Sequence, residues 1–175
     1  MRLSLVDSNP EVAEALVRAF APYPEVQVSC ADLLSLAEGT AVSPANSQGF
    51  MDGGIDRQYV EFFGKEIEAR VRDAILRREH GSLPVGASLI VGTGHPRIPN
   101  LIVATTMISP EHVDPANAYR AMRAVLRIAA QHATVVDCVF CPGLCTGVGH
   151  AAPNVSAENM AEAYRDWQHA SNVED

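Results

Sequence analysis

The sequence contains no apolar run of the roughly 18 residues that a membrane-spanning helix requires. Its first residues also lack the basic and apolar segments that together make a secretory signal peptide. We therefore expect a soluble protein of the cytoplasm, with no membrane as a partner.

Basic residues are also scarce, because 13 Lys and Arg stand against 21 Asp and Glu, giving a formal net charge of -8. That balance argues against nucleic acid or an anionic membrane as an electrostatically steered partner. A small anionic ligand remains compatible with it, because backbone N–H groups can bind such a ligand locally.

Cysteines number only four, of which Cys138, Cys141 and Cys145 lie close together, while Cys30 stands apart. Thiolates at short spacing hold zinc and iron-sulfur centres. Residues 135–141, however, have the pattern of a buried strand, on which residues three apart point to opposite faces. We therefore expect free, buried thiols, no metal and no cofactor.

The rest of the chain reads as one domain spanning residues 1–175, in which strand and helix signals alternate without an internal repeat. The expected strands are residues 3–6, 26–30, 40–43, 87–91, 101–105 and 135–140. The expected helices begin at Pro10 after the capping Asn9, near Ile55, after Asp114-Pro115 and near Ser156. The helix from Ile55 is expected to reach Arg78. Strands 87–91 and 101–105 are expected to be interior strands of the sheet. Residues Ser171 to Asp175 are expected to be frayed. This pattern predicts an α/β fold, a three-layer α/β/α sandwich with a mixed, largely parallel sheet.

Two glycine-rich segments follow predicted strands, residues 43–56 and residues 141–150. In open α/β sheets, ligands bind at the carboxyl ends of the strands, and such loops can turn successive N–H groups toward an anion. Neither Walker A nor the dinucleotide G-x-G-x-x-G pattern is present in its proper context. Taken alone, the second segment is equally compatible with a flexible turn between a strand and a helix.

In combination, the two segments resemble the macro domain family, the ADP-ribose-binding fold. Residues 43–46 (Ser-Pro-Ala-Asn) are similar to the family's N-A-A-N, and residues 52–56 (Asp-Gly-Gly-Ile-Asp) to its G-G-G-V-D. Ala31-Asp32-Leu33, residues 83–86 (Leu-Pro-Val-Gly) and residues 145–148 (Cys-Thr-Gly-Val) match three further motifs in order. The resemblance covers residues 26–167 and leaves residues 1–23 as a subfamily decoration.

The resemblance implies a role for each part of the cleft. Asp32 would accept a hydrogen bond from the adenine amine, the two loops would hold the diphosphate, and Asn46 and Asp56 would act as catalytic residues at the distal ribose. Helix capping is the alternative role for both aspartates. The implied ligand-binding residues are Asp32, Leu33, Ala45, Asn46, Gly53, Gly54, Ile55, Gly143, Leu144, Cys145, Thr146, Gly147 and Val148.

The sequence departs from the family pattern at four positions. Ser43 replaces the first Asn, Asp52 the first of three glycines, and Cys145 the Gly before Thr146. Gly149 stands where the family often has an aromatic residue over the distal ribose, a cover that Phe50 of the other loop is a candidate to supply.

The implied function is binding of ADP-ribose, or of a mono-ADP-ribosylated protein, with hydrolysis of the mono-ADP-ribosyl bond. Three alternatives stay open: a non-catalytic reader of ADP-ribose or a related nucleotide metabolite, a phosphatase acting on ADP-ribose 1''-phosphate, and a scaffold without a working pocket.

Overall fold

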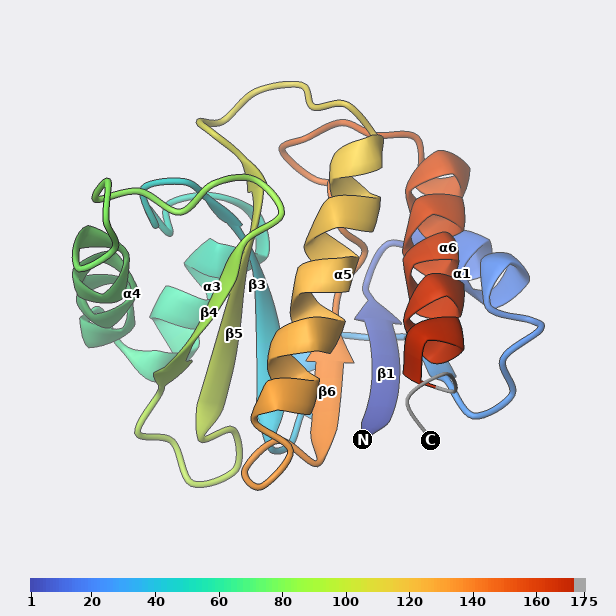
Figure 1. Cartoon of the computed structure of the whole chain (residues 1–175), viewed down its shortest axis with the longest axis horizontal. Coiled ribbons are helices and arrows are strands. Elements are labelled where there is room, and N and C mark those ends of the chain that lie inside the picture. Colours follow the sequence, from blue (N-terminus) through green and yellow to red (C-terminus); the bar gives the residue numbers. More distant parts are fainter. Residues whose placement is uncertain (172–175) are drawn as a thin grey trace.

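The computed structural model describes residues 1–171, which form six strands and six helices (Figure 1). The strands are β1 (Arg2–Asp7), β2 (Gln27–Cys30), β3 (Thr40–Asn46), β4 (Ser88–Gly92), β5 (Asn100–Met107) and β6 (Cys138–Cys141). The helices are α1 (Pro10–Ala19), α2 (Leu33–Leu36), α3 (Gly54–Phe63), α4 (Glu66–Leu76), α5 (Ala116–Gln131) and α6 (Pro153–Ser171). The end expected to be frayed lies outside the described residues, except for Ser171. Within residues 1–171, none of the helices has the length and apolar character needed to span a bilayer.

The strands form one sheet in the order β2-β1-β6-β3-β5-β4, in which every neighbouring pair is parallel except β4 and β5. The predicted mixed, largely parallel sheet is therefore confirmed. The expectation that residues 87–91 form an interior strand was wrong, because β4 lies at the edge. Helices α4 and α5 both contact β4, so its two faces are covered and its sequence is as apolar as that of an interior strand.

Helices cover both faces of the sheet and create two cores, as expected for a three-layer sandwich. Helices α1, α5 and α6 lie on one face, with α5 and α6 in front of the sheet in Figure 1. Helices α3 and α4 cover the other face, together with the short α2. Adjacent strand residues serve opposite cores, since Ala41 packs toward α3 and α4 and Val42 toward α5 and α6.

The long helix expected from Ile55 to Arg78 is two helices. Gly64 adopts a φ of 95°, in the left-handed region that favours glycine, and α3 ends at Phe63. The apolar spacing continues across this break, which explains why the sequence pattern suggested one helix. The break allows α4 to pack against the loop that follows β3, where a Cβ on Gly49 would lie 2.7 Å from Ile75 Cδ1.

Residues 1–23 are integrated into the sandwich. Strand β1 pairs with both β2 and β6, and α1 packs against α6. Asn9 caps α1 as expected, its side chain accepting a hydrogen bond from Glu11 N. The parallel arrangement therefore brings the carboxyl ends of β1, β3, β5 and β6 to one edge of the sheet.

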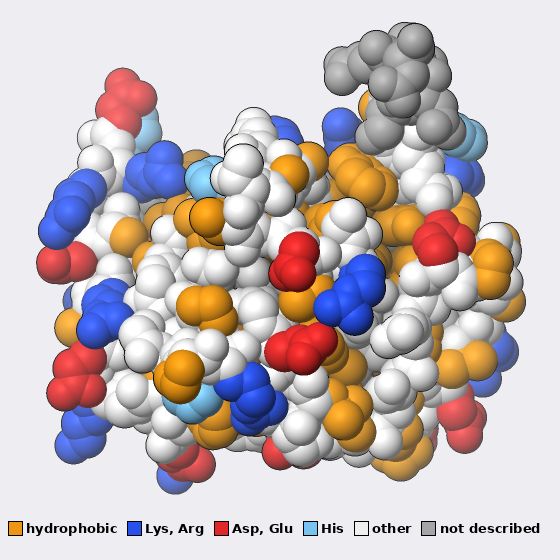
Figure 2. Space-filling model, turned by 90° about the horizontal axis from the view of Figure 1, so that it is seen from below, with side chains coloured by type: hydrophobic (Ala, Val, Ile, Leu, Met, Phe, Trp, Pro, Cys, Tyr) orange, Lys and Arg blue, Asp and Glu red, His pale blue; other side chains and the backbone are white. Residues whose placement is uncertain are grey.

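The opposite end of the molecule carries charges of both signs, interspersed over its surface (Figure 2). Arg2 and Glu38 form an ion pair there at 3.2 Å, and both side chains are more than half exposed. Such exposed pairs contribute little to stability. No single sign of charge dominates this end, in contrast to α5, which is described below.

Candidate functional site

A cleft of about 290 Å³ lies at the carboxyl ends of β1, β3, β5 and β6. Its two principal walls are the segment from Pro44 to Gln58, which contains the start of α3, and the loop from Pro142 to Gly149, which follows β6. The sequence-predicted residues that line it are Asp32, Leu33, Asn46, Gly53, Gly54, Ile55, Asp56, Gly143, Cys145, Thr146, Gly147 and Val148. Ala45 and Leu144 do not line the cleft, because both are buried in the hydrophobic cores.

Sequence reasoning missed a group of lining residues that comes from the ends of β1 and β5. These residues include Asp7, Ser8, Asn9, Val12, Thr106, Met107 and Pro110. Asp7 supports the β6 loop, because its Oδ2 accepts a hydrogen bond from Gly143 N at 3.0 Å and its Oδ1 one from Asn9 N at 2.9 Å. The available signal was a carboxylate at the carboxyl end of a parallel strand.

The β6 loop presents unpaired backbone N–H groups. Within residues 1–171, the N–H groups of residues 145–148 have no protein acceptor. Leu144, which the resemblance placed among the ligand-binding residues, does not offer a free N–H, because its N–H donates to Met160 Sδ at 3.5 Å. Successive free N–H groups at a glycine-rich turn form an anion-binding concavity.

The opposite wall is the first turn of α3, whose N-cap is Gly53. Across residues 1–171, the N–H groups of residues 54–56 find no protein acceptor, as is usual at a helix start. A Cβ on Gly53 would lie 3.7 Å from Val148 Cγ2 of the facing loop, so a side chain at position 53 would narrow the cleft. No lysine or arginine lines the cleft in the described part of the chain. An anion bound here would therefore depend on backbone dipoles.

Asp32 caps a helix and leaves one carboxylate oxygen without a partner among residues 1–171. Its Oδ1 accepts a hydrogen bond from Leu34 N at 3.1 Å and so caps α2. Its Oδ2 has no partner among residues 1–171, and the residue lines the cleft at the end where β1 and β2 finish. One carboxylate oxygen is thus available to a donor on a ligand.

The Asn46 amide is largely occupied by its own loop. Its Oδ1 accepts hydrogen bonds from Gln48 N at 3.1 Å and Phe50 N at 3.2 Å, and its Nδ2 donates to Phe50 O at 2.8 Å. Both acceptor positions are used, and one N–H remains. Asn46 can therefore donate one hydrogen bond to a ligand but cannot also accept one, contrary to the expectation from its side-chain type.

Asp56 is a buried carboxylate paired with Ser43. Ser43 Oγ donates to Asp56 Oδ1 at 2.6 Å, while Ser43 is fully buried and Asp56 only 6% exposed. Burial raises the pKa of Asp56 to about 7, the Ser43 hydrogen bond opposes this rise, and the charges of Asp52 and Glu68 add to it. A carboxyl group that titrates near neutrality at a cleft wall can take up a proton at physiological pH.

Phe50 forms part of the cleft wall and is supported from behind by α4. The Arg72 guanidinium lies 4.0 Å from the centre of its ring, and Glu68 accepts a hydrogen bond from Met51 N at 2.7 Å. Gly149, by contrast, has no room for a side chain, because a Cβ there would lie 2.7 Å from Cys145 O and 2.9 Å from Val113 Cγ2. The aromatic residue at the wall is therefore on the α3 side of the cleft.

The clustered cysteines Cys138, Cys141 and Cys145 are free and buried, as expected, whereas Cys30 is free and exposed. Cys138 Sγ donates to Glu38 O at the start of β6, whereas Cys145 lines the cleft beyond the end of that strand. Burial raises the pKa of Cys145 to about 12, so its thiol stays neutral. In the part of the chain that the structure describes, no three His, Cys, Asp or Glu side chains gather as metal ligands.

Comparison with known proteins gives consistent results. The family profile described as Macro domain matches residues 42–160. An uncharacterized protein of Aquifex aeolicus is 30% identical over 145 residues, which is 82% of this chain and 83% of that protein. The macrodomain of Mycobacterium tuberculosis DarG superposes with a TM-score of 0.67 at 19% identity, covering 79% of this chain and 88% of that one. Thermosipho africanus DarTG in complex with ADP-ribose superposes with a TM-score of 0.63 at 14% identity, covering 93% of this chain and 50% of that one.

Proposed function

The chain belongs to the macro domain family, and on that premise we propose that its cleft binds ADP-ribose. The observation that carries the proposal is the presence of free backbone N–H groups on two opposite walls of the cleft. One set lies on the β6 loop and the other at the start of α3. Free N–H groups on both walls of a cleft that has no Lys or Arg among its described lining residues suit a diphosphate. The ADP-ribose complex of Thermosipho africanus DarTG, which shares this fold, supports the same ligand.

The remaining parts of the ligand have partners on either side of the diphosphate. At the β1–β2 end, the free Oδ2 of Asp32 suits the exocyclic amine of adenine. At the β3–β5 end, the remaining N–H of Asn46 suits a hydroxyl of the distal ribose. Phe50 would cover that sugar in place of the aromatic residue that Gly149 cannot supply.

We further propose that the protein hydrolyses the bond between C1 of the distal ribose and an acidic side chain of a mono-ADP-ribosylated protein. Water would add its oxygen to C1, the C1–O bond to the protein would break, and the protein carboxylate would leave with the bonding electrons. Asp56, alone or with a substrate phosphate, would position the water and accept its proton. Burial raises its pKa to about 7, which supports this role because a carboxylate with a raised pKa is a stronger proton acceptor.

A reader module that binds ADP-ribose without turnover is the second candidate. The engagement of Asn46 favours it, because both acceptor positions of the amide serve the Asn46–Phe50 loop and cannot orient a water molecule as acceptors. Asp56 would then be a buried group of the wall with no catalytic part.

Two measurements test these proposals in order. Calorimetry with ADP-ribose, ADP and AMP tests binding, and absence of heat with ADP-ribose at about 1 mM ligand would reject both the hydrolase and the reader. Incubation with a protein mono-ADP-ribosylated on glutamate then separates them. A hydrolase releases ADP-ribose, and Asp56→Asn slows that release by about 100-fold or more while the Kd for ADP-ribose stays within about threefold. Binding without release identifies a reader.

A further inference from the structure

A second hollow, of about 830 Å³, lies along the exposed side of α5 and is bounded by α6 and by the loop at Val85 and Gly86. Three arginines of α5 line it: Arg120, Arg123 and Arg127. Their spacing of three and four residues places them on one face of the helix. From Arg120 to Arg127 this basic stripe runs for about 11 Å along the helix axis.

The basic stripe contrasts with the rest of the protein. Helix α5 carries three arginines and no carboxylate, so the remaining residues hold 10 basic and 21 acidic side chains, or -11 against +3. Among residues 1–171, no carboxylate oxygen lies within 4 Å of a stripe guanidinium. Arg120 donates instead to Asn117 Oδ1 at 2.7 Å, and Arg123 to Tyr119 Oη at 3.5 Å.

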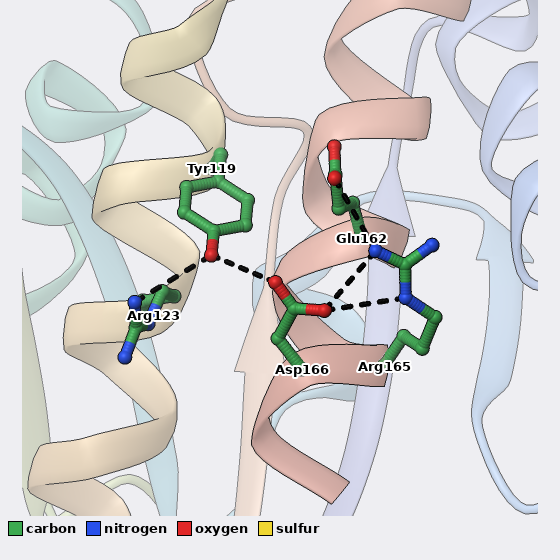
Figure 3. A network of polar contacts seen from close by, with 5 residues as sticks. All are labelled: Tyr119, Arg123, Glu162, Arg165 and Asp166. Carbon is green, nitrogen blue, oxygen red and sulfur yellow. Dashed lines mark hydrogen bonds and ion pairs between the residues drawn. The ribbon is translucent and has the colours of Figure 1, made fainter. Parts of the chain in front are cut away.

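Helix α6 borders the hollow through Asp166, whose carboxylate is already engaged. Asp166 accepts hydrogen bonds from Tyr119 Oη at 2.9 Å and from Arg165 at 3.1 Å, and Arg165 also pairs with Glu162 (Figure 3). These contacts, led by the one from Tyr119, hold the pKa of Asp166 below its usual value. Asp166 is therefore engaged by Tyr119 and Arg165, with a smaller influence from Arg123 of the stripe, while α6 as a whole carries three carboxylates and one arginine.

The stripe is connected to the cleft through hydrogen bonds. Arg120 contacts Asn117, whose Nδ2 donates to Thr106 O at 2.9 Å, and Thr106 lines the cleft. The Arg120 end of the stripe is therefore linked through Asn117 to Thr106, near the carboxyl end of β5 at the cleft rim. A polypeptide lying along α5 could continue toward the cleft from that end.

We propose that this hollow binds an acidic segment of a partner protein. Three guanidiniums on one helical face, without an ion pair among residues 1–171, match carboxylates spaced along a peptide. The small and apolar residues that line the hollow with them, Ala124 and Ala130 of α5 and Val85, suit a polypeptide backbone. A nucleic acid fits less well, because the hollow offers three basic side chains over about 11 Å, whereas a continuous phosphate chain is bound through a longer array of basic contacts. The proposal does not depend on ADP-ribose binding or turnover in the cleft.

The test is fluorescence anisotropy of the full chain with a fluorescein-labelled oligoglutamate of about ten residues, long enough to span the stripe in extended form. Trp167 is the only tryptophan and lines the hollow, so its emission reports binding there. We expect saturable binding with a change in Trp167 emission. A triple variant with Arg120→Gln, Arg123→Gln and Arg127→Gln should lose at least about tenfold in affinity.

A matched control carries Arg18→Gln, Arg77→Gln and Arg78→Gln on α1 and at the end of α4, which changes the net charge by the same three units. It should bind the peptide within about twofold of the unchanged protein at about 150 mM salt. Equal losses in both variants would reduce the effect to net charge and overturn the proposal. So would tighter binding of a single-stranded oligonucleotide of equal charge, or no peptide binding at all. A gain in affinity from Glu174→Gln and Asp175→Asn would identify the chain's own end as the occupant and also overturn it.

Discussion

The hydroxyl of Ser43 donates a 2.6 Å hydrogen bond to the carboxylate of Asp56, and both residues are buried beside the cleft. Ser43 departs from the asparagine that the family commonly carries, yet it provides the one donor within residues 1–171 that Asp56 Oδ1 contacts. The departure therefore comes with a specific partner, and the pair can be tested directly.

Loss of this hydroxyl should raise the pKa of Asp56 further. The Ser43 hydrogen bond lowers that pKa against the effect of burial, so Ser43→Ala removes the opposing contribution. We expect the carboxyl titration of Asp56, followed by NMR, to move to higher pH. If the protein is a hydrolase, the acid limb of its pH–rate profile should move in the same direction. Ser88→Ala, which removes a hydroxyl bonded to Ala124 O of α5 on the opposite face of the sheet, should leave the titration unchanged.

Asp56 should also make the protein less stable as the pH rises. Its folded pKa of about 7 lies above the ordinary value of 3.8, so the folded state holds a proton that the unfolded state has lost between these values. The resulting loss in the free energy of unfolding is absent below pH 3.8, grows up to about pH 7 and then stays constant. It reaches about 4 kcal/mol at most. Asp56→Asn should therefore raise the free energy of unfolding at pH 8 by more than at pH 5, as measured by urea denaturation. An equal change at both values would contradict the raised pKa.

Phe50 should affect only ligands that carry the distal ribose. Phe50→Ala removes the aromatic face from the cleft wall, and we expect about a tenfold loss in affinity for ADP-ribose with ADP affinity nearly unchanged. Phe50→Tyr keeps the ring and serves as the control. Equal losses for both ligands would show that Phe50 acts on the shape of the Asn46 loop and does not cover the sugar.

Salt should have little effect on binding in the cleft. The described lining residues include no Lys or Arg, so the ligand would be held by backbone N–H groups. Raising NaCl from about 50 to 500 mM should therefore change the Kd for ADP-ribose by less than about threefold. Calorimetry over that range checks the expectation. A loss of tenfold or more would indicate that cationic side chains contribute to binding.

Much of the fold could be predicted from the sequence because its signals are local. Asn9 followed by Pro10 marks the start of α1, and short apolar runs between the helices mark the strands. The break at Gly64 and the edge position of β4 were missed, because apolar spacing does not record a change in helix direction or the order of strands.

The site was predictable to the level of which segments meet. Motif order indicated that residues 43–56 and 141–150 come together, and both line the cleft. Which donor and acceptor atoms of the site are free to contact a ligand depends on residues that are distant in sequence. No local sequence pattern encodes those contacts. Met160 removes Leu144 N from the free donors, and Arg72 supports Phe50 from α4. The engagement of the Asn46 amide within its own loop is local, but it requires the turn geometry to be known.

Binding of ADP-ribose by Gly147→Glu is the most direct test of the account. A Cβ on Gly147 meets no atom within 4 Å, so the variant should fold while placing bulk and negative charge in the diphosphate cradle. Gly92→Glu is the matched control, since Gly92 is equally open and pairs with Asn100 at the other end of the sheet. By calorimetry, we predict that wild type and Gly92→Glu bind ADP-ribose alike and that Gly147→Glu gives no binding heat. Wild-type affinity in Gly147→Glu, or no binding by the wild type at about 1 mM ligand, would contradict the proposed cleft.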